Sequence, residues 1–130
     1  MNPVLKVEDL KVTIAGNPVV DGVSFEVDQG EILSVVGESG CGKSMTAFAV
    51  MGLLPKAARL AGGRVLFGST DLATVSEKQR RSLRGDDLAM IFQEPVASLN
   101  PLMPVGRQIA ESLIVHGKAK GRDPHKAAIA

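Results

Sequence analysis

Short apolar segments separated by turn residues fill the first third of the chain. Residues 4–14 read as one strand, and Gly16-Asn17-Pro18 as the turn that follows it. Residues 23–27 alternate apolar and polar side chains, which is typical of a half-buried strand, and we expect the two strands to lie antiparallel. Asp28-Gln29-Gly30 then turns the chain into a third apolar run, residues 32–36, which we predict to be a buried strand.

The later elements are also predicted from apolar spacing and from the residues that begin or end a segment. In chain order they are a nearly all-apolar helix over 43–54 ended by Pro55, a strand over 64–67, a short helix over 76–84 with Ser76 as its N-cap, a central strand over 88–92, and an amphipathic helix over 106–116. Because strands and helices alternate in this part of the chain, we expect an α/β fold whose sheet is mixed and begins with an antiparallel part.

A phosphate-binding motif lies between the third apolar run and the first helix. Residues 37–44, Gly-Glu-Ser-Gly-Cys-Gly-Lys-Ser, match the pattern G-x-x-x-x-G-K-[ST]. Glycines allow successive N–H groups to turn toward an anion, and the following helix adds the positive end of its dipole. The alternative interpretation of this segment is a glycine-rich turn before a helix. Such a turn requires neither the lysine nor the serine, so their presence favours phosphate binding.

Each residue type in the motif suits a nucleotide bound with Mg²⁺. We expect the Lys43 ammonium to contact the β- and γ-phosphates and the Ser44 hydroxyl to bind the metal, since Mg²⁺ takes few protein oxygens. The candidate nucleotide-binding residues are Gly37, Glu38, Ser39, Gly40, Cys41, Gly42, Lys43, Ser44 and Met45.

The single cysteine, Cys41, is inside this motif. One cysteine excludes an internal disulfide and suits a reducing compartment. A thiol at a helix N-terminus beside a lysine is expected to be reactive, and bound nucleotide should shield it. The alternative is a small residue that the loop tolerates.

Composition narrows the possible partners. The chain is 45% hydrophobic and 22% charged with a net charge of +1, so it lacks the excess of positive charge that is typical of nucleic-acid-binding proteins. Its aromatic residues are four Phe with no Trp or Tyr, so it also lacks the rings on which single-stranded nucleic acids stack.

The start, residues 1–9, lacks the basic and apolar regions of a signal peptide, and no apolar segment approaches the roughly 20 residues of a membrane span. We therefore expect a cytosolic protein.

Three motifs together carry a family resemblance over essentially all 130 residues. They are GESGCGKS at 37–44, MGLLP at 51–55 and, most specifically, MIFQEPVASLNP at 90–101. With these motifs the chain resembles the N-terminal part of an ABC transporter ATP-binding subunit, in the dipeptide, oligopeptide or nickel importer branch. The resemblance implies the fold of a P-loop NTPase, with ATP and Mg²⁺ as cofactors.

The resemblance also assigns roles to single residues. Gln93 would be the Q-loop glutamine, whose side-chain oxygen reaches Mg²⁺ and the attacking water, so the implied metal ligands are Ser44 and Gln93. Glu94 belongs to the same loop and is not expected to be catalytic. Members of the family stack adenine on an aromatic ring near the position of Ile14, so this chain would offer only apolar contact and would discriminate weakly between ATP and GTP.

Other family motifs have no counterpart in this sequence. The signature motif, the Walker B Asp-Glu pair and the switch histidine are not found, so we expect a fragment without catalytic residues that is marginally stable and does not hydrolyse ATP alone. The expected division is a β-subdomain and P-loop core over about 1–95, followed over about 96–130 by the Q-loop exit and the start of a helical subdomain.

Three functional classes remain at this point. The first is the energy-coupling ATPase of a peptide or related importer, peripheral on the cytoplasmic face of the membrane, with transmembrane permease subunits and a second ATP-binding subunit, identical or different, as partners. The second is a nucleotide-binding fragment without turnover, and the third is an unrelated P-loop kinase or GTPase. The solute, whether peptide, nickel or glutathione, is not encoded in these residues.

Overall fold

A computed structural model describes residues 3–118 and 123–128 of the chain. These residues form two compact units that divide between Arg80 and Arg81.

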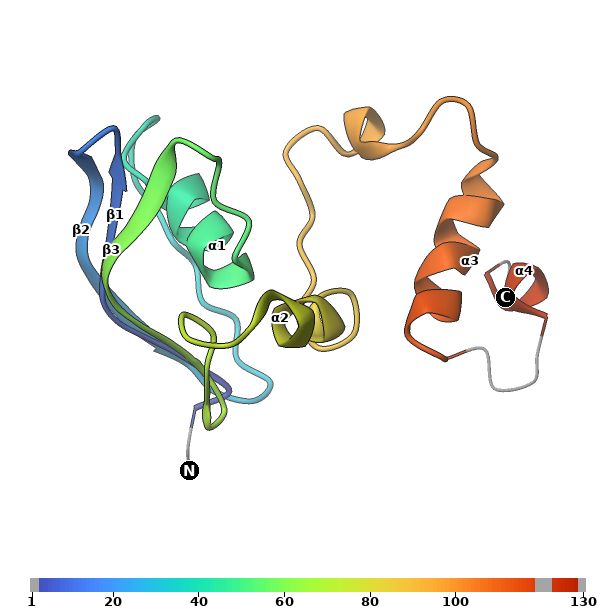
Figure 1. Ribbon diagram of the computed structural model, residues 1–130, viewed down its shortest axis with the longest axis horizontal. Helices are drawn as coiled ribbons and strands as arrows, with labels where there is room; N and C mark the ends of the chain where they lie inside the picture. Colours follow the sequence, from blue (N-terminus) through green and yellow to red (C-terminus); the bar gives the residue numbers. More distant parts are fainter. Residues whose placement is uncertain (1–2, 119–122, 129–130) are drawn as a thin grey trace. The chain divides into compact units, whose positions relative to one another are not determined.

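The first unit is built on a four-stranded sheet of order β2-β1-β3-β4, in which every pairing is antiparallel (Figure 1). The strands are β1 (Leu5–Ile14), β2 (Asn17–Val27), β3 (Ala58–Phe67) and β4 (Thr70–Asp71). The predicted antiparallel pairing of the first two strands is confirmed, and β3 begins well before the predicted residue 64. β1 therefore occupies the centre, with partners on both edges.

A bulge in β1 explains why its neighbour β3 carries a glycine at position 63. Asp9 has a φ of 46°, which is unusual for a residue with a side chain, and its backbone N–H donates to Ser24 Oγ at 2.8 Å. Gly63 of β3 has a φ of 86°, and a Cβ there would meet the backbone carbonyl oxygens of Glu8 and Asp9. Only glycine allows β3 to approach the bulge so closely.

Helix α1 (Lys43–Met51) packs against the sheet and completes the core of this unit (Figure 1). It ends one turn before the predicted Leu54, because Gly52 adopts a left-handed φ of 62° and closes the helix. The buried apolar side chains of the unit come from the three long strands, α1 and Leu72: Val7, Leu10, Val12, Val20, Val50, Met51, Ala58, Val65 and Leu72.

Helix α2 (Glu77–Leu83) begins as predicted at Ser76. The Ser76 backbone N–H donates to Gln79 Oε1 at 3.0 Å, and the Gln79 N–H donates to Ser76 Oγ at 3.3 Å. This reciprocal pair is a capping box, which satisfies two backbone donors that the helix start would leave unpaired.

Two predicted strands are wrong. Residues 32–36 and 88–92 form no strand, and Ile32, Val36 and Ile91 are 92%, 88% and 91% exposed. A strand that is apolar on both faces needs a hydrogen-bonded neighbour on each edge and a layer over each face, and the described strands supply neither. The parallel part of the predicted mixed sheet is therefore not formed among the described residues.

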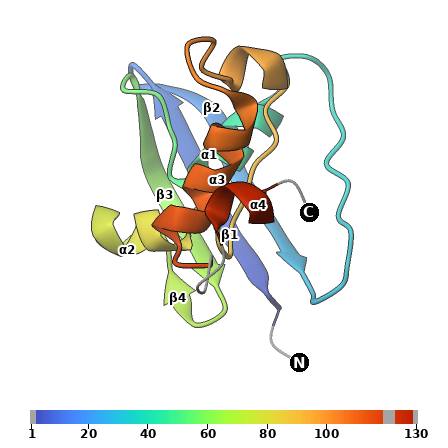
Figure 2. The same ribbon diagram turned by 90° about the vertical axis from the view of Figure 1, so that its right-hand side faces the viewer.

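The second unit contains a 3₁₀ turn and two helices. Pro95–Ser98 is the 3₁₀ turn, and α3 (Val105–Val115) matches the predicted amphipathic helix and buries Ala110 completely. The short α4 (Pro124–Ala127) begins at Asp123, whose side chain accepts a hydrogen bond from the His125 N–H, and it lies beside α3 (Figure 2). Among the described residues of this unit, Ala110 is the only buried one.

An ion-pair cluster ties the three long strands together at one end. Lys6 Nζ lies 2.8 Å from Glu26 Oε1 on β2 and 3.2 Å from Glu8 Oε1, and Glu8 also pairs with Arg64 of β3 at 2.6 Å. The hydrogen bond from Lys6 holds the pKa of the Glu8 carboxyl below its ordinary value. Hydrogen bonds to Glu26 and Glu8 raise the pKa of Lys6. The cluster is therefore charged at neutral pH and couples β1 to both neighbours.

Candidate phosphate site

The loop from β2 to α1 follows an open path and ends in two glycines with left-handed backbones. Gly40 and Gly42 have φ values of 80° and 95°, and Gly42 occupies the N-cap position of α1. A Cβ at Gly42 would lie 2.6 Å from the Val19 carbonyl oxygen and 3.1 Å from Val20 Cγ2. Glycine is therefore required here both for the turn and for the close approach of the loop to β2.

The first turn of α1 is fixed by a residue that the sequence did not single out. Thr46 is only 7% exposed, and both its backbone N–H and its hydroxyl donate to the Gly42 carbonyl oxygen, at 2.8 and 3.0 Å. Thr46 thus locks the helix onto the glycine where the loop ends. The sequence could have indicated this contact, because a threonine four residues after a glycine can donate its hydroxyl to that glycine's backbone carbonyl within a helix.

Lys43 directs its ammonium back into the loop. Its Nζ donates to the carbonyl oxygens of Gly37 and Glu38 at 2.7 and 2.6 Å, and lies 3.4 Å from Cys41 Sγ. An ammonium has three N–H donors, so the one directed at the weakly accepting sulfur is the easiest to transfer to a phosphate oxygen. The lysine holds the loop closed and keeps a positive charge at its centre.

Ser39 and Ser44, the two hydroxyl residues of the motif, are exposed, and so is Cys41. Cys41 is nevertheless close to the backbone of the loop, because a Cβ at Gly37 would lie 2.5 Å from its Sγ. An accessible thiol in this position can be modified by a reagent that also obstructs the loop.

A cavity of about 250 Å³ opens beside the loop within the first unit. It brings the predicted Ile14 together with part of the predicted motif, and its lining consists of Ile14, Val19, Gly40, Gly42, Lys43, Ser44 and Met45. Pockets that enclose an entire small-molecule ligand commonly exceed about 300 Å³, so a cavity of this size can hold part of a nucleotide but not all of it. Val19 was not predicted; the signal available in the sequence was its position just after the predicted turn at residues 16–18.

The residues of this cavity fit a nucleotide phosphate by their chemistry. Lys43 supplies a charge, the left-handed glycines free the backbone N–H groups that begin α1, and the helix points its positive dipole end at the same place. The hydroxyl of Ser44 is an oxygen ligand of the kind that Mg²⁺ prefers.

Gln93 and Glu94 belong to the second unit, and both are exposed. Glu94 occupies the N-cap position of the 3₁₀ turn and makes no side-chain capping bond there. The predicted roles of Gln93 at the metal and of Glu94 as a non-catalytic loop residue stay predictions.

An unpredicted network organises the segment after Gln93. The Asn100 N–H donates to Gln108 Oε1 at 2.9 Å, and Gln108 Nε2 returns hydrogen bonds to the carbonyl oxygens of Asn100 and Met103 at 3.0 and 2.8 Å. Asn100 Oδ1 accepts from the Leu102 N–H at 3.0 Å. Gln108 of α3 therefore holds the end of the 90–101 motif in a fixed turn.

Comparison with known proteins agrees with this geometry. A family profile described as ABC transporter matches residues 20–128, which include the whole phosphate loop and the segment around Gln93. The chain belongs to the ABC transporter family. The resemblance inferred from three short motifs is thus confirmed over most of the chain.

Similar relatives include ATP-binding proteins of peptide transport systems. The dipeptide transport ATP-binding protein DppD of Bacillus subtilis is 46% identical over 131 residues, a match that covers 97% of this chain and 39% of the relative. The oligopeptide transport ATP-binding protein OppD of the same organism is 43% identical over 130 residues, covering 96% and 36%. This chain therefore spans about two-fifths of the length of these two relatives.

A solved structure described as an ATP binding subunit of an ABC transporter has the same fold. It superposes with a TM-score of 0.62 at 23% identity and covers 88% of this chain and 43% of that one. Within residues 3–118 and 123–128, we find no helix that combines the length and the apolar character needed to cross a membrane.

Proposed function

We propose that this chain is the phosphate-binding part of the ATP-binding, energy-coupling subunit of an ABC transporter that imports peptides or a related solute. The observation that carries the proposal is the Lys43 ammonium, held inside a glycine loop at the start of α1 by two backbone carbonyls. The names of the relatives, which are dipeptide and oligopeptide transport proteins, support the class of solute. The family assignment disfavours an unrelated kinase or GTPase.

Titration of a fluorescent ATP analogue with Mg²⁺ tests the proposal directly. Lys43→Ala removes a charge-assisted hydrogen bond worth about 1.5–3 kcal/mol, so the Kd should rise roughly 10- to 150-fold. Lys78→Ala is the matched control, because Lys78 is an exposed lysine on α2. If the two variants bind alike, or if the parent chain binds nothing, the proposed function is wrong for this chain.

Ser44 is the proposed Mg²⁺ ligand from the loop, and Gln93 is the proposed ligand from the segment that follows the 88–92 run. Both supply neutral oxygens, which can bind the metal without adding a buried charge. Ser44→Ala should therefore weaken binding of the Mg²⁺ complex and leave binding of the nucleotide in EDTA nearly unchanged. An equal loss in both conditions would place Ser44 at the phosphates instead.

We assign the purine base to the apolar side of the cavity, against Ile14 and Val19. These side chains offer no hydrogen bond that reads the base, so the Kd values for Mg-ATP and Mg-GTP should differ by less than about tenfold. Ile14→Phe adds a stacking surface worth about 1 kcal/mol or more and should tighten binding about fivefold, whereas Thr13→Phe, on the opposite face of β1, should not. A strong preference for ATP in the parent chain would contradict this assignment.

A measurement of ATP hydrolysis distinguishes a chain that only binds the nucleotide from one that also hydrolyses it. A water must lose a proton to a positioned base, and none of the residues assigned here is such a base. We therefore expect saturable binding with no sustained phosphate release from this chain alone. Release that Lys43→Ala abolishes and Lys78→Ala preserves would instead show that the chain is a complete ATPase.

The proposed partners are the transmembrane permease and a second ATP-binding subunit, which would place the protein peripherally at the cytoplasmic face of the membrane. Helix α3 offers a surface for such a partner, since Val105, Ile109 and Ile114 are 53%, 49% and 56% exposed. Exposed apolar side chains gathered on one helix are typical of a protein interface.

A further inference from the structure

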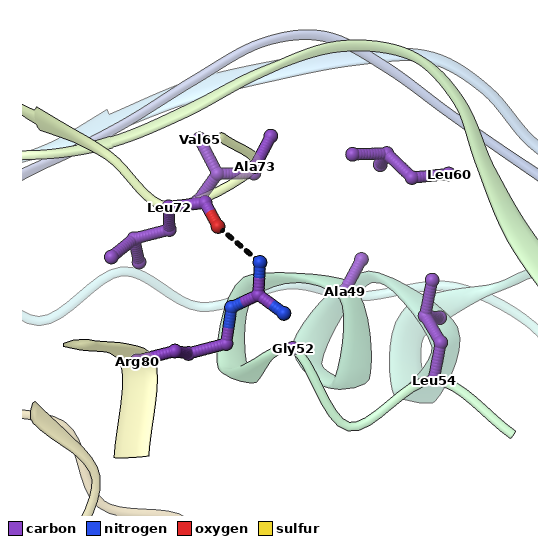
Figure 3. A pocket seen from close by; sticks show the side chains of 8 residues that line it. All are labelled: Ala49, Gly52, Leu54, Leu60, Val65, Leu72, Ala73 and Arg80. Atoms are coloured by element: carbon purple, nitrogen blue, oxygen red, sulfur yellow. Dashed lines mark hydrogen bonds between the residues drawn. The ribbon is translucent and has the colours of Figure 1, made fainter. Parts of the chain in front are cut away.

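A second cavity lies at the opposite end of α1 from the phosphate loop (Figure 3). It has a volume of about 190 Å³ and belongs entirely to the first unit. Its lining is apolar except for one arginine, and consists of Ala49, Gly52, Leu54, Leu60, Val65, Leu72, Ala73 and Arg80. No residue of the phosphate loop contributes to it.

Arg80 extends from α2 into this space and is only 21% exposed. Its Nη2 donates to the Leu72 carbonyl oxygen at 2.6 Å (Figure 3). Its Nη1 lies 3.4 Å from Glu77 Oε2. Among the described residues its buried Nε finds no hydrogen-bond partner. Burying a guanidinium with one unpaired donor is costly, so another interaction must compensate for it.

Gly52, the residue that closes α1, lies directly against Arg80. A Cβ at position 52 would lie 2.7 Å from Arg80 Nε, closer than real Cβ atoms come, and 3.1 Å from Cζ. Gly52 and Leu53 return their N–H groups to the carbonyl oxygens of Ala49 and Phe48 at 3.1 and 2.8 Å. The guanidinium thus rests on the carbonyl end of the helix.

This placement supplies what α1 lacks. None of the residues in its last turn, all of them in the described part of the chain, is basic. A cation at a helix C-terminus interacts favourably with the helix dipole. Arg80, which belongs to α2, provides that cation. Its guanidinium also donates a hydrogen bond to the carbonyl oxygen of Leu72, the residue after β4, and so connects the end of α1 to the sheet.

We propose that Arg80 is a positioning residue for nucleotide binding, which acts through α1 on the phosphate loop at the other end of that helix. A nine-residue helix moves as one body, and Thr46 locks its first turn to Gly42, so fixing its last turn limits how the loop can tilt. The proposal rests on the nucleotide-binding function proposed above. Arg80 itself touches neither the loop nor its cavity.

The test compares Arg80→Met with Arg81→Met. Methionine keeps the aliphatic packing on Gly52 and removes the guanidinium, and Arg81 is an exposed arginine on the same helix. Two quantities are measured at a temperature where circular dichroism shows both variants fully folded: the Kd of the fluorescent ATP analogue with Mg²⁺, and the rate at which Cys41 reacts with a thiol reagent without nucleotide. The second reports on the loop alone.

Arg80→Met should raise the Kd about tenfold, as expected if the binding-competent fraction falls to about a tenth. It should also change the Cys41 rate by more than about threefold, beyond what an ordinary surface substitution produces. Arg81→Met should leave both within about twofold of the parent chain. A lower melting temperature with both readouts unchanged would show that Arg80 only stabilises the fold, and would overturn the proposal.

Two further outcomes remain decisive. If the parent chain binds no nucleotide, the proposed function fails, and the Cys41 rate alone decides whether Arg80 controls the loop. If Arg80→Met does not fold, Arg80→Gln, which keeps one donor for Leu72 but no charge, is judged by the same two readouts. Equal Cys41 rates in the Arg80 variant and the Arg81 control would overturn the proposal in either case.

Discussion

Substitution of Gly42 tests whether β2 shapes the phosphate loop. Gly42→Ala forces a residue with a Cβ into a φ of 95°, which costs about 1–2 kcal/mol. The new Cβ would also lie 2.6 Å from the Val19 carbonyl oxygen, and relieving such overpacking costs about 1–3 kcal/mol more. The total is about 2–5 kcal/mol.

Gly40→Ala is the matched control for backbone strain alone. Gly40 has a φ of 80°, but a Cβ there would meet nothing within 4 Å. Its cost is therefore about 1–2 kcal/mol, reduced by the entropy that alanine removes from the unfolded chain. Only the collision with β2 distinguishes the two variants.

The strain can reduce either the stability of the fold or the affinity of the loop for nucleotide, so both quantities are measured. Urea unfolding gives the loss in the free energy of unfolding, and titration with the ATP analogue gives the loss in binding if the loop shifts instead. The two losses together should be larger for Gly42→Ala than for Gly40→Ala by about 1–3 kcal/mol. Summed losses that agree within about 0.5 kcal/mol would refute the close contact between loop and strand.

Three further predictions concern the sheet, the ion pairs and the loop. Gly63→Ala should destabilise the chain by about 2–5 kcal/mol in urea unfolding, because the Cβ meets the β1 bulge, whereas Gly62→Ala, with ordinary contacts of 3.6 Å, should be nearly neutral; similar values would contradict the bulge geometry. Glu8 has a lowered pKa in the folded chain, so its stabilising contribution is complete above its unfolded pKa and is lost as the pH falls through the folded value. The difference in melting temperature between the parent chain and Glu8→Gln should thus be present at pH 7 and disappear under acid conditions; a difference that grows on acidification would be inconsistent with this. Mg-ATP should slow alkylation of Cys41, followed by mass spectrometry, and an unchanged rate at saturation would argue against nucleotide in the loop.

The local elements were predictable because their signals are local. The turn after Ile14 and the alternation over 23–27 gave the antiparallel β1 and β2, and Ser76 as an N-cap residue gave the start of α2. The glycine loop with Lys43 at the start of a helix was equally visible, since the motif is a run of eight residues.

The features that the sequence did not reveal depend on contacts between distant residues. The β1 bulge places Asp9 against Gly63 of another strand, and Arg80 reaches Gly52 and Leu72 from a different helix. Neither pairing leaves a periodic signal, because each depends on how two separate segments are brought together.

The sequence by itself determined the family, the phosphate motif and the type of most elements. Only the tertiary structure decided which apolar runs become strands: residues 58–67 find β1 as a partner, whereas residues 32–36 and 88–92, at least as apolar, do not. Side-chain chemistry records a tendency toward burial, but a strand forms only where a neighbouring backbone accepts its hydrogen bonds and a packed layer covers its face.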